Sequence, residues 1–290
     1  MNQTNLKYQF ARLNIAEKII VINVAVFLLV RLLKFLLQLQ PWYLESWFEL
    51  PRGFMDFLLK PWTLITYSFL HGGFMHIFFN MLLLYYVARI LFNYFVPRRF
   101  IKLNFLGVML GGAFFLLAYN LFPAFSASQS PLIGASAGVM AVLIFICTYI
   151  PNQEVRVFFF NVKLWHIGVF FVLLDLAFIP FGNAGGRIAH LGGALLGYLY
   201  ARKSLEGKDM GAGFSRLLDQ LGELFKRDKK APMKTVYKKK QSASTKKVDY
   251  EKETRQRKID KILDKISKSG YDSLTKAEKD FLFKAGKEED

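Results

Sequence analysis

Six long apolar runs, separated by stretches rich in charged residues, proline or glycine, fill the first two thirds of the chain. An α-helix needs about 20 apolar residues to cross the roughly 30 Å of hydrocarbon in a bilayer, and most of these runs come close to that length. Their approximate limits are 17–38, 73–95, 100–122, 134–150, 162–180 and 187–203. The pattern therefore predicts an all-α, polytopic membrane protein with six transmembrane helices.

The charge pattern predicts an orientation for these helices. The 290-residue chain is 53% hydrophobic yet has a formal net charge of +17. Basic residues gather at one end of the predicted spans, and the tail carries more: Lys7, Arg12, Lys18, Arg98, Arg99, Lys102, Arg156 and Lys163, and 25 of the 39 Lys and Arg in residues 201–290. Positive loops favour the cytosolic side, so we expect both termini in the cytosol. We also expect a protein of the bacterial inner (cell) membrane.

The same patterns divide the chain into four parts. We expect a cytosolic N-terminal segment (1–16), a six-helix transmembrane domain (17–204), a basic and disordered linker (205–249) and a small helical module (250–290). In the last part, Thr275 and Glu278 form a capping-box pattern at a helix start. Between the first two spans, the aromatic-rich loop 39–62 predicts a short interfacial helix at 53–60.

A serine among very small residues opens the fourth run. Gly134-Ala135-Ser136-Ala137-Gly138 places the Ser136 hydroxyl at a helix start, where small neighbours allow backbones and a substrate to approach. Such a serine is either a packing residue between helices or a nucleophile. The second interpretation requires a base and oxyanion donors on other segments.

Other runs carry residues suited to those roles. His76 and Asn80 are four residues apart and share one helix face, so both can donate to one acceptor. His190 precedes Gly193 by three and lies near the Gly193/Gly197 stripe, which predicts a close helix contact. Contact with the fourth run would bring the imidazole to the Ser136 hydroxyl.

Two further polar groups leave alternatives open. Asp175 in the fifth run is an intramembrane carboxyl that needs a partner; we expect a structural role, while orientation of His190 stays open. A zinc site is not expected, because His71 and His76 do not share a face and no third ligand follows. The single cysteine, Cys147, is expected to be a packing residue.

Together these motifs resemble the rhomboid intramembrane serine proteases, over roughly residues 15–205. The resemblance implies a dyad of Ser136 as nucleophile and His190 as general base, without a catalytic aspartate and without metal or cofactor. It assigns His76 and Asn80 to the oxyanion side and gives supporting positions to three more residues: His71, Gly134 and Gly193. Pro61-Trp62 matches the loop tryptophan of the family.

The chain departs from the family pattern at four positions. Ala137 stands where glycine is usual, Met140 where an aromatic often stacks under the base, Thr63 where an arginine often follows the tryptophan, and an acidic residue is missing near Asn93. We expect Ala137 to be tolerated and Met140 to lower activity only slightly. Thr63 and the missing acidic residue are expected to affect loop rigidity and local stability and not the chemistry.

The implied function is cleavage of transmembrane or juxtamembrane peptide bonds in other membrane proteins. The alternative is a catalytically silent rhomboid-like protein that binds membrane-protein clients. Expected partners are transmembrane substrates, the lipid bilayer and a cytosolic partner of the tail. Nucleic-acid binding is not expected, because aromatics are not interleaved with the tail's charges.

Overall fold

The chain divides into two compact units, Met1–Phe225 and Lys226–Asp290, which are considered separately. The computed structural model describes residues 6–40, 42–125, 130–157, 159–224 and 258–287. The linker expected at 205–249 therefore lies outside the described residues from residue 225 onward.

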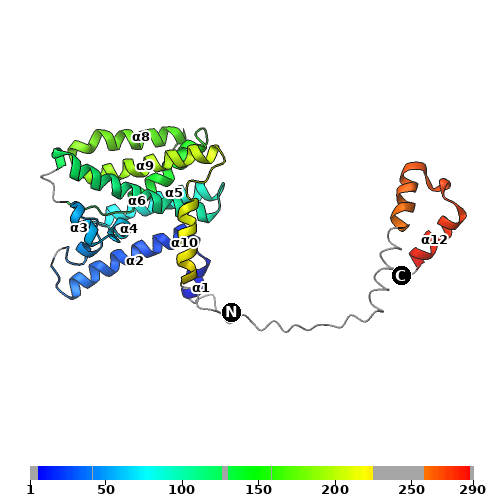
Figure 1. Ribbon diagram of the computed structural model, residues 1–290, viewed down its shortest axis with the longest axis horizontal. Helices are drawn as coiled ribbons and strands as arrows, with labels where there is room; N and C mark the ends of the chain where they lie inside the picture. The colour runs from blue at the N-terminus through cyan, green and yellow to red at the C-terminus, as the bar shows by residue number, and fades with distance from the viewer. Residues whose placement is uncertain (1–5, 41, 126–129, 158, 225–257, 288–290) are drawn as a thin grey trace. The chain divides into compact units, whose positions relative to one another are not determined.

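The first unit is a bundle of α-helices with a few short turns between them. Its helices are α1 (Leu6–Arg12), α2 (Ile15–Leu36), α3 (Phe54–Leu59), α4 (Thr63–Thr66), α5 (Phe74–Phe92), α6 (Pro97–Leu121), α7 (Ser136–Tyr149), α8 (Leu164–Phe178), α9 (Ala184–Leu205) and α10 (Ala212–Leu224). Single 3-10 turns lie at Glu45–Trp47, Tyr67–Phe69, Pro123–Phe125 and Ile179–Phe181. Figure 1 shows α6, α8 and α9 running side by side, with α2 on the opposite side of the bundle from α8.

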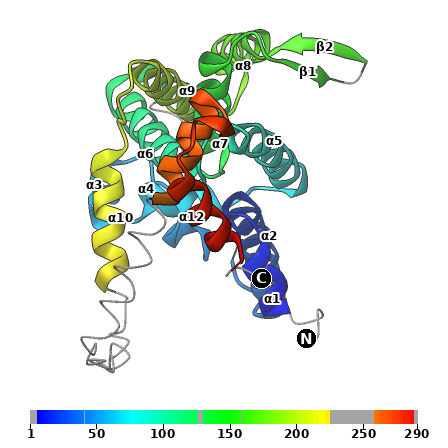
Figure 2. The ribbon, with the colours of Figure 1, turned by 90° about the vertical axis from the view of Figure 1, so that its right-hand side faces the viewer.

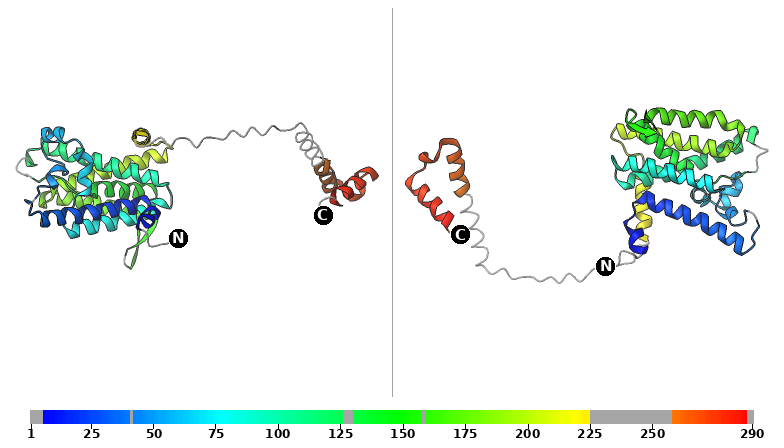
Figure 3. Two further views of the ribbon diagram at one scale, coloured as in Figure 1. Left: turned by 90° about the horizontal axis from the view of Figure 1, so that it is seen from below. Right: turned by 180° about the vertical axis from the view of Figure 1, so that it is seen from behind.

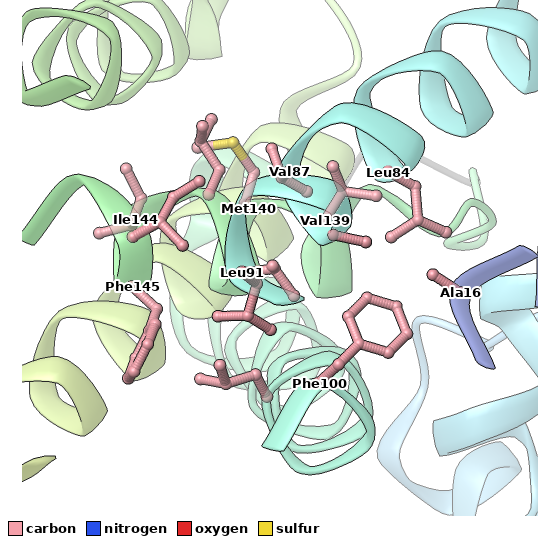
Figure 4. Close-up of a cluster of buried hydrophobic side chains, with 14 of the residues drawn as sticks. Ala16, Leu84, Val87, Leu91, Phe100, Val139, Met140, Ile144 and Phe145 are labelled. Carbon is pink, nitrogen blue, oxygen red and sulfur yellow. The ribbon is translucent and has the colours of Figure 1, made fainter. Parts of the chain in front are cut away.

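The central helix of the bundle is α7. It packs against α5, α6, α8 and α9, and it is buried without interruption from Ala137 to Cys147. In Figure 4, Met140 and Phe145 of α7 lie in one apolar cluster with Leu91 of α5 and Phe100 of α6. Ser136 is therefore the first residue of the helix that lies at the centre of the bundle. Cys147 is buried among these apolar side chains, in keeping with a packing role.

The predicted count of six spans is only partly supported. By length and composition, four helices in the described part of the chain are able to cross a membrane: α2, α5, α6 and the continuous stretch Leu164–Phe181. At the fourth predicted span, α7 has only 14 residues. At the sixth, α9 has 22 residues but is rich in glycine and carries Arg187 and His190, which lower its hydropathy.

The expectation of an all-α fold needs a correction. Strands β1 (Glu154–Val157) and β2 (Phe160–Lys163) form an antiparallel hairpin between α7 and α8, with Val155 opposite Val162 (Figure 2). Each strand has only four residues. The fold is therefore mostly helical and not all-α. The hairpin was not predicted, because an alternating pattern this short does not stand out between two long apolar runs.

The linker prediction also needs a correction at its start, where residues 212–224 form α10. Phe214, Leu217, Leu218 and Leu221 recur at helical spacing there, a signal hidden by the charged residues around them. The segment before α10 is anchored to the bundle, because the Asp209 carboxylate accepts hydrogen bonds from Lys102 and Tyr200 and, at 3.0 Å, from the Gly211 N–H.

The second unit is a helical hairpin, formed by a helix at 258–269 and by α12 (Lys276–Lys287), drawn orange and red in Figure 3. Gly270, at φ +77°, ends the first helix. The predicted capping box is present: the Glu278 N–H donates to Thr275 Oγ1 at 3.3 Å and the Thr275 N–H donates to Glu278 Oε2 at 2.8 Å. Lys265 joins the two helices through an ion pair of 2.9 Å with Glu278.

Candidate active site

The backbone just before Ser136 is fixed by the loop between α2 and α5. Leu132 pairs with Leu50 through two backbone hydrogen bonds of 2.9 and 3.1 Å, and the Gly134 N–H donates to the Tyr67 carbonyl at 3.0 Å. Gly134 has φ +120°, a conformation that side chains disfavour. The turn therefore delivers Ser136 to the start of α7 in a defined position, where it remains partly exposed.

Helices α7 and α9 touch backbone to backbone beside this turn. A Cβ placed on Gly193 would lie 2.1 Å from the Ala137 carbonyl oxygen, and one on Gly197 would lie 2.3 Å from the Ala141 carbonyl oxygen. The glycine stripe thus contacts the fourth apolar run, the partner that the proposed dyad requires. His190 is one turn before Gly193 on α9, and Ser136 directly precedes Ala137 on α7.

His76 borders the same space as Ser136. A Cβ placed on Gly134 would be 2.8 Å from His76 Nε2 and 3.7 Å from Ser136 Oγ. The Gly72 N–H donates to His76 Nδ1 at 3.3 Å, so a neutral His76 carries its proton on Nε2, the nitrogen that faces Gly134. A donor is thereby aimed at the gap beside the Ser136 hydroxyl.

Asn80 and His71 both contact His76. The Asn80 amide donates to the His76 carbonyl at 2.8 Å, within α5. The His71 ring lies edge-on to the His76 ring with centroids 5.1 Å apart. Burial, reinforced by the neighbouring His76, lowers the pKa of His71 to about 4, so His71 is neutral at physiological pH.

His190 is held by an acidic side chain of α8. Its Nδ1 is 3.0 and 3.1 Å from the two carboxylate oxygens of Asp175, and Arg187 donates to Asp175 at 3.3 Å. Within the described residues, no hydrogen bond joins Ser136 and His190. Hydrogen bonds between catalytic groups are often long in the absence of substrate.

The loop tryptophan and two residues that depart from the family pattern, Thr63 and Met140, have partners of their own. Trp62 donates through its indole N–H to the Trp47 carbonyl at 2.8 Å. Thr63 is fully buried and donates to the Lys60 carbonyl at 2.6 Å. Met140 is buried in the core around α7. The loop is therefore tied together without an arginine after Trp62.

Comparison with known proteins decides the family. A family model described as "Rhomboid domain" matches residues 59–206, which is half of the chain and includes Ser136, His190 and His76. The chain belongs to the rhomboid family. In this rhomboid, residues 245–285 also match a family of unknown function, DUF6576.

Two relatives of this rhomboid are named as mitochondrial proteins. It is 31% identical over 144 residues to RHOMBOID-like protein 12, mitochondrial, from Arabidopsis thaliana, a match that covers 46% of this chain and 43% of the relative. It is 28% identical over 141 residues to Presenilin-associated rhomboid-like protein A, mitochondrial, from Danio rerio, covering 47% of this chain and 36% of the relative. The matched part is less than half of either relative. These names contradict the expected bacterial inner membrane, a prediction that no residue pattern in the chain had supported.

The sequence indicated most of the residues gathered here but not all of their contacts. Asp175 stood out as an intramembrane carboxyl, while its contact with His190 depends on how α8 packs beside α9. The role of Gly72 was missed, because a backbone N–H leaves no signature in a residue pattern.

Proposed function

We propose that this rhomboid is an intramembrane serine endopeptidase that cleaves transmembrane or juxtamembrane peptide bonds of membrane-protein substrates. Ser136 is the nucleophile and His190 the general base, with neither metal nor cofactor in the reaction. The observation that supports the proposal is the close contact of α7 with α9 at Ala137 and Gly193, which brings the two helices carrying the dyad together.

In the first half of the reaction, Ser136 Oγ attacks the scissile carbonyl carbon and His190 Nε2 takes the hydroxyl proton. The new O–C bond forms as the carbonyl π electrons move to oxygen. His190 then returns the proton to the leaving amine, the C–N bond breaks and an acyl-enzyme remains. Water, activated by His190, hydrolyses the acyl-enzyme in the same way. The partly exposed Ser136 and His190 side chains leave a route for that water.

The tetrahedral oxyanion needs donors close to Ser136. His76 Nε2–H faces the gap beside Gly134 and is the first donor in this proposal, with the Ser136 backbone N–H as a second. Asn80 is proposed as a third donor, through the amide N–H that is not bonded to the His76 carbonyl. His71, Gly134 and Gly193 act by positioning these groups.

The same proposal includes the membrane arrangement. α7 and α9 complete six spans with the four helices that are long and apolar enough to cross a membrane, and both termini lie on one side of the bilayer. Burial of α7 among four other helices explains how so short a span is accommodated. The partners are transmembrane protein substrates and the surrounding lipid, with the hairpin of residues 258–287 proposed to dock on a further protein.

One observation favours a second candidate, a catalytically silent protein that binds membrane-protein clients. In the described residues Ser136 and His190 are not hydrogen-bonded to each other. In this alternative, the close packing around Ser136 serves only the stability of the bundle.

Cleavage of a model transmembrane substrate in liposomes separates the two candidates. We expect product from the wild type and at least about a 10³-fold loss in Ser136→Ala and in His190→Ala, because removing a nucleophile or its base abolishes most of the rate. Thr148→Val, on the same α7, and His166→Ala, on α8, are matched controls that should retain cleavage. Equal product from all variants, or none from the wild type with client binding retained, would exclude the enzymatic proposal.

A further inference from the structure

Asp175 is the most unusual polar group in the bundle, because it is a carboxylate with only 3% of its surface exposed. It lies in the apolar stretch Leu164–Phe181, where an ionised carboxylate is costly without partners. Both of its described partners come from α9: His190 at 3.0 and 3.1 Å and Arg187 at 3.3 Å. A charged group this well buried and directed at the proposed base needs an explanation.

The contact with His190 has a direct chemical consequence. An ionised carboxylate only accepts hydrogen bonds, so the imidazole nitrogen facing it, Nδ1, must carry a proton. In the neutral ring the other nitrogen, Nε2, then holds the free lone pair. Nε2 is the nitrogen that the proposed reaction needs as the acceptor of the Ser136 proton.

We infer that Asp175 is a positioning residue for His190, so that this rhomboid works with a Ser136–His190–Asp175 arrangement and not with a bare dyad. Asp175 fixes the tautomer and the orientation of the ring. When Nε2 takes the Ser136 proton, the carboxylate stabilises the imidazolium while remaining ionised itself. This inference rests on the proposed function and adds a residue to it.

Arg187 has a separate part in this arrangement. It is three residues before His190 on α9, so both side chains reach Asp175 from one helix face. Its guanidinium is farther from the carboxylate than Nδ1 is, and it also lies over the Phe178 ring at 5.1 Å. Arg187 therefore places a compensating positive charge beside the buried carboxylate.

The competing explanation is that Asp175 only pins α8 to α9. A structural pin and a positioning residue differ in what they control: the pin sets the stability of the bundle, while the positioning residue sets the tautomer of His190 and the rate of the chemical step. Asp175→Asn separates these, because the amide has the same shape, bears no charge and can donate to Nδ1.

The first test is kinetic, with the full chain in liposomes. We expect Asp175→Asn to lower kcat by on the order of 10²–10⁴-fold, with KM changed by less than about threefold, because a substrate would still bind while the base is in the wrong tautomer. Asp209→Asn is the matched control, since it removes a carboxylate from another ion pair, with Lys102, outside the site. Unchanged kcat in Asp175→Asn, or an equal loss in Asp209→Asn, would overturn the inference.

The second test does not depend on cleavage. The chain has only four histidines, so ¹⁵N-labelled imidazoles are assignable from single His variants in lipid nanodiscs. We expect His190 to be protonated on Nδ1 in the wild type and on Nε2 in Asp175→Asn, with the control variant unchanged. An Nε2–H tautomer in the wild type would refute the positioning role. A wild type that cleaves nothing but has the expected tautomer would refute only the proposed protease function.

Discussion

At the scale of single residues, the space between His76 and Ser136 depends on the absence of one side chain. Gly134 has φ +120°, and a Cβ on it would lie 2.8 Å from His76 Nε2. The other ring nitrogen of His76, Nδ1, accepts a hydrogen bond from the Gly72 N–H. The Gly72 carbonyl in turn accepts one from Arg31 at 2.7 Å. An added methyl group would therefore meet a ring that has little freedom to move away.

From this geometry we predict that Gly134→Ala damages activity more than stability. Backbone strain of this kind costs about 1–3 kcal/mol, whereas displacement of the His76 donor is expected to lower kcat by on the order of 10²-fold. Both effects are measurable, by thermal unfolding in detergent and by cleavage in liposomes.

Gly182→Ala is the matched control for that variant. Gly182 has a similar φ of +109°, but nothing lies within 4 Å of a Cβ built on it. It should show the strain without the loss of cleavage. Equal cleavage by the two variants would mean that the gap beside Ser136 is not where the oxyanion is bound.

At the scale of whole helices, the site depends on how closely α9 approaches α7. Ala137 lies between two glycine positions: a Cβ on Gly111 of α6 would be 2.6 Å from the Ala137 Cβ, and one on Gly193 would be 2.1 Å from its carbonyl oxygen. Three helices thus meet within one residue of Ser136. The small residues of α9 are the reason why it packs so tightly.

We predict that Gly193→Ala forces α9 away from α7. Overpacking of this kind costs about 1–3 kcal/mol, and a shift of His190 by 1 Å would reduce cleavage by about 10²-fold. Gly213→Ala in α10, where a Cβ would contact nothing within 4 Å, should be neutral or slightly stabilising. Normal cleavage by Gly193→Ala would argue against a dyad assembled by this helix contact.

The helices also show how far the sequence is informative. Long apolar runs placed α2, α5, α6 and α8 within about three residues of their observed limits, because burial in lipid or protein requires an apolar side chain at nearly every position. The β1–β2 hairpin and α10 were missed, because short amphipathic elements are masked by their charged surroundings. The contact of Asp175 with His190 was left open, since the distance between two helices depends on packing and not on spacing along the chain.

At the scale of the whole molecule, the chain combines a membrane bundle with a second unit that has its own small core. Ile262, Leu274 and Ala285 are buried within residues 258–287, and the Lys265–Glu278 ion pair links the two helices there. The two family matches follow the same division, with the rhomboid domain at 59–206 and the other family at 245–285. Each unit therefore has the contacts expected of an independently folded part.

We therefore predict that ending the chain after Phe225 leaves the bundle intact. All contacts described around Ser136, His190 and Asp175 come from residues before 206, and Lys102 and Tyr200 of the same unit hold the segment around Asp209. The truncated chain should keep its unfolding midpoint within about 2 °C and its cleavage rate on a model substrate within about twofold, since the residues of the site all belong to the first unit. A chain ending after Leu205, which also loses the Asp209 anchor, is the informative comparison and should unfold at lower temperature. A large loss of cleavage in the chain ending at Phe225, with unfolding unchanged, would instead assign the second unit a part in substrate capture.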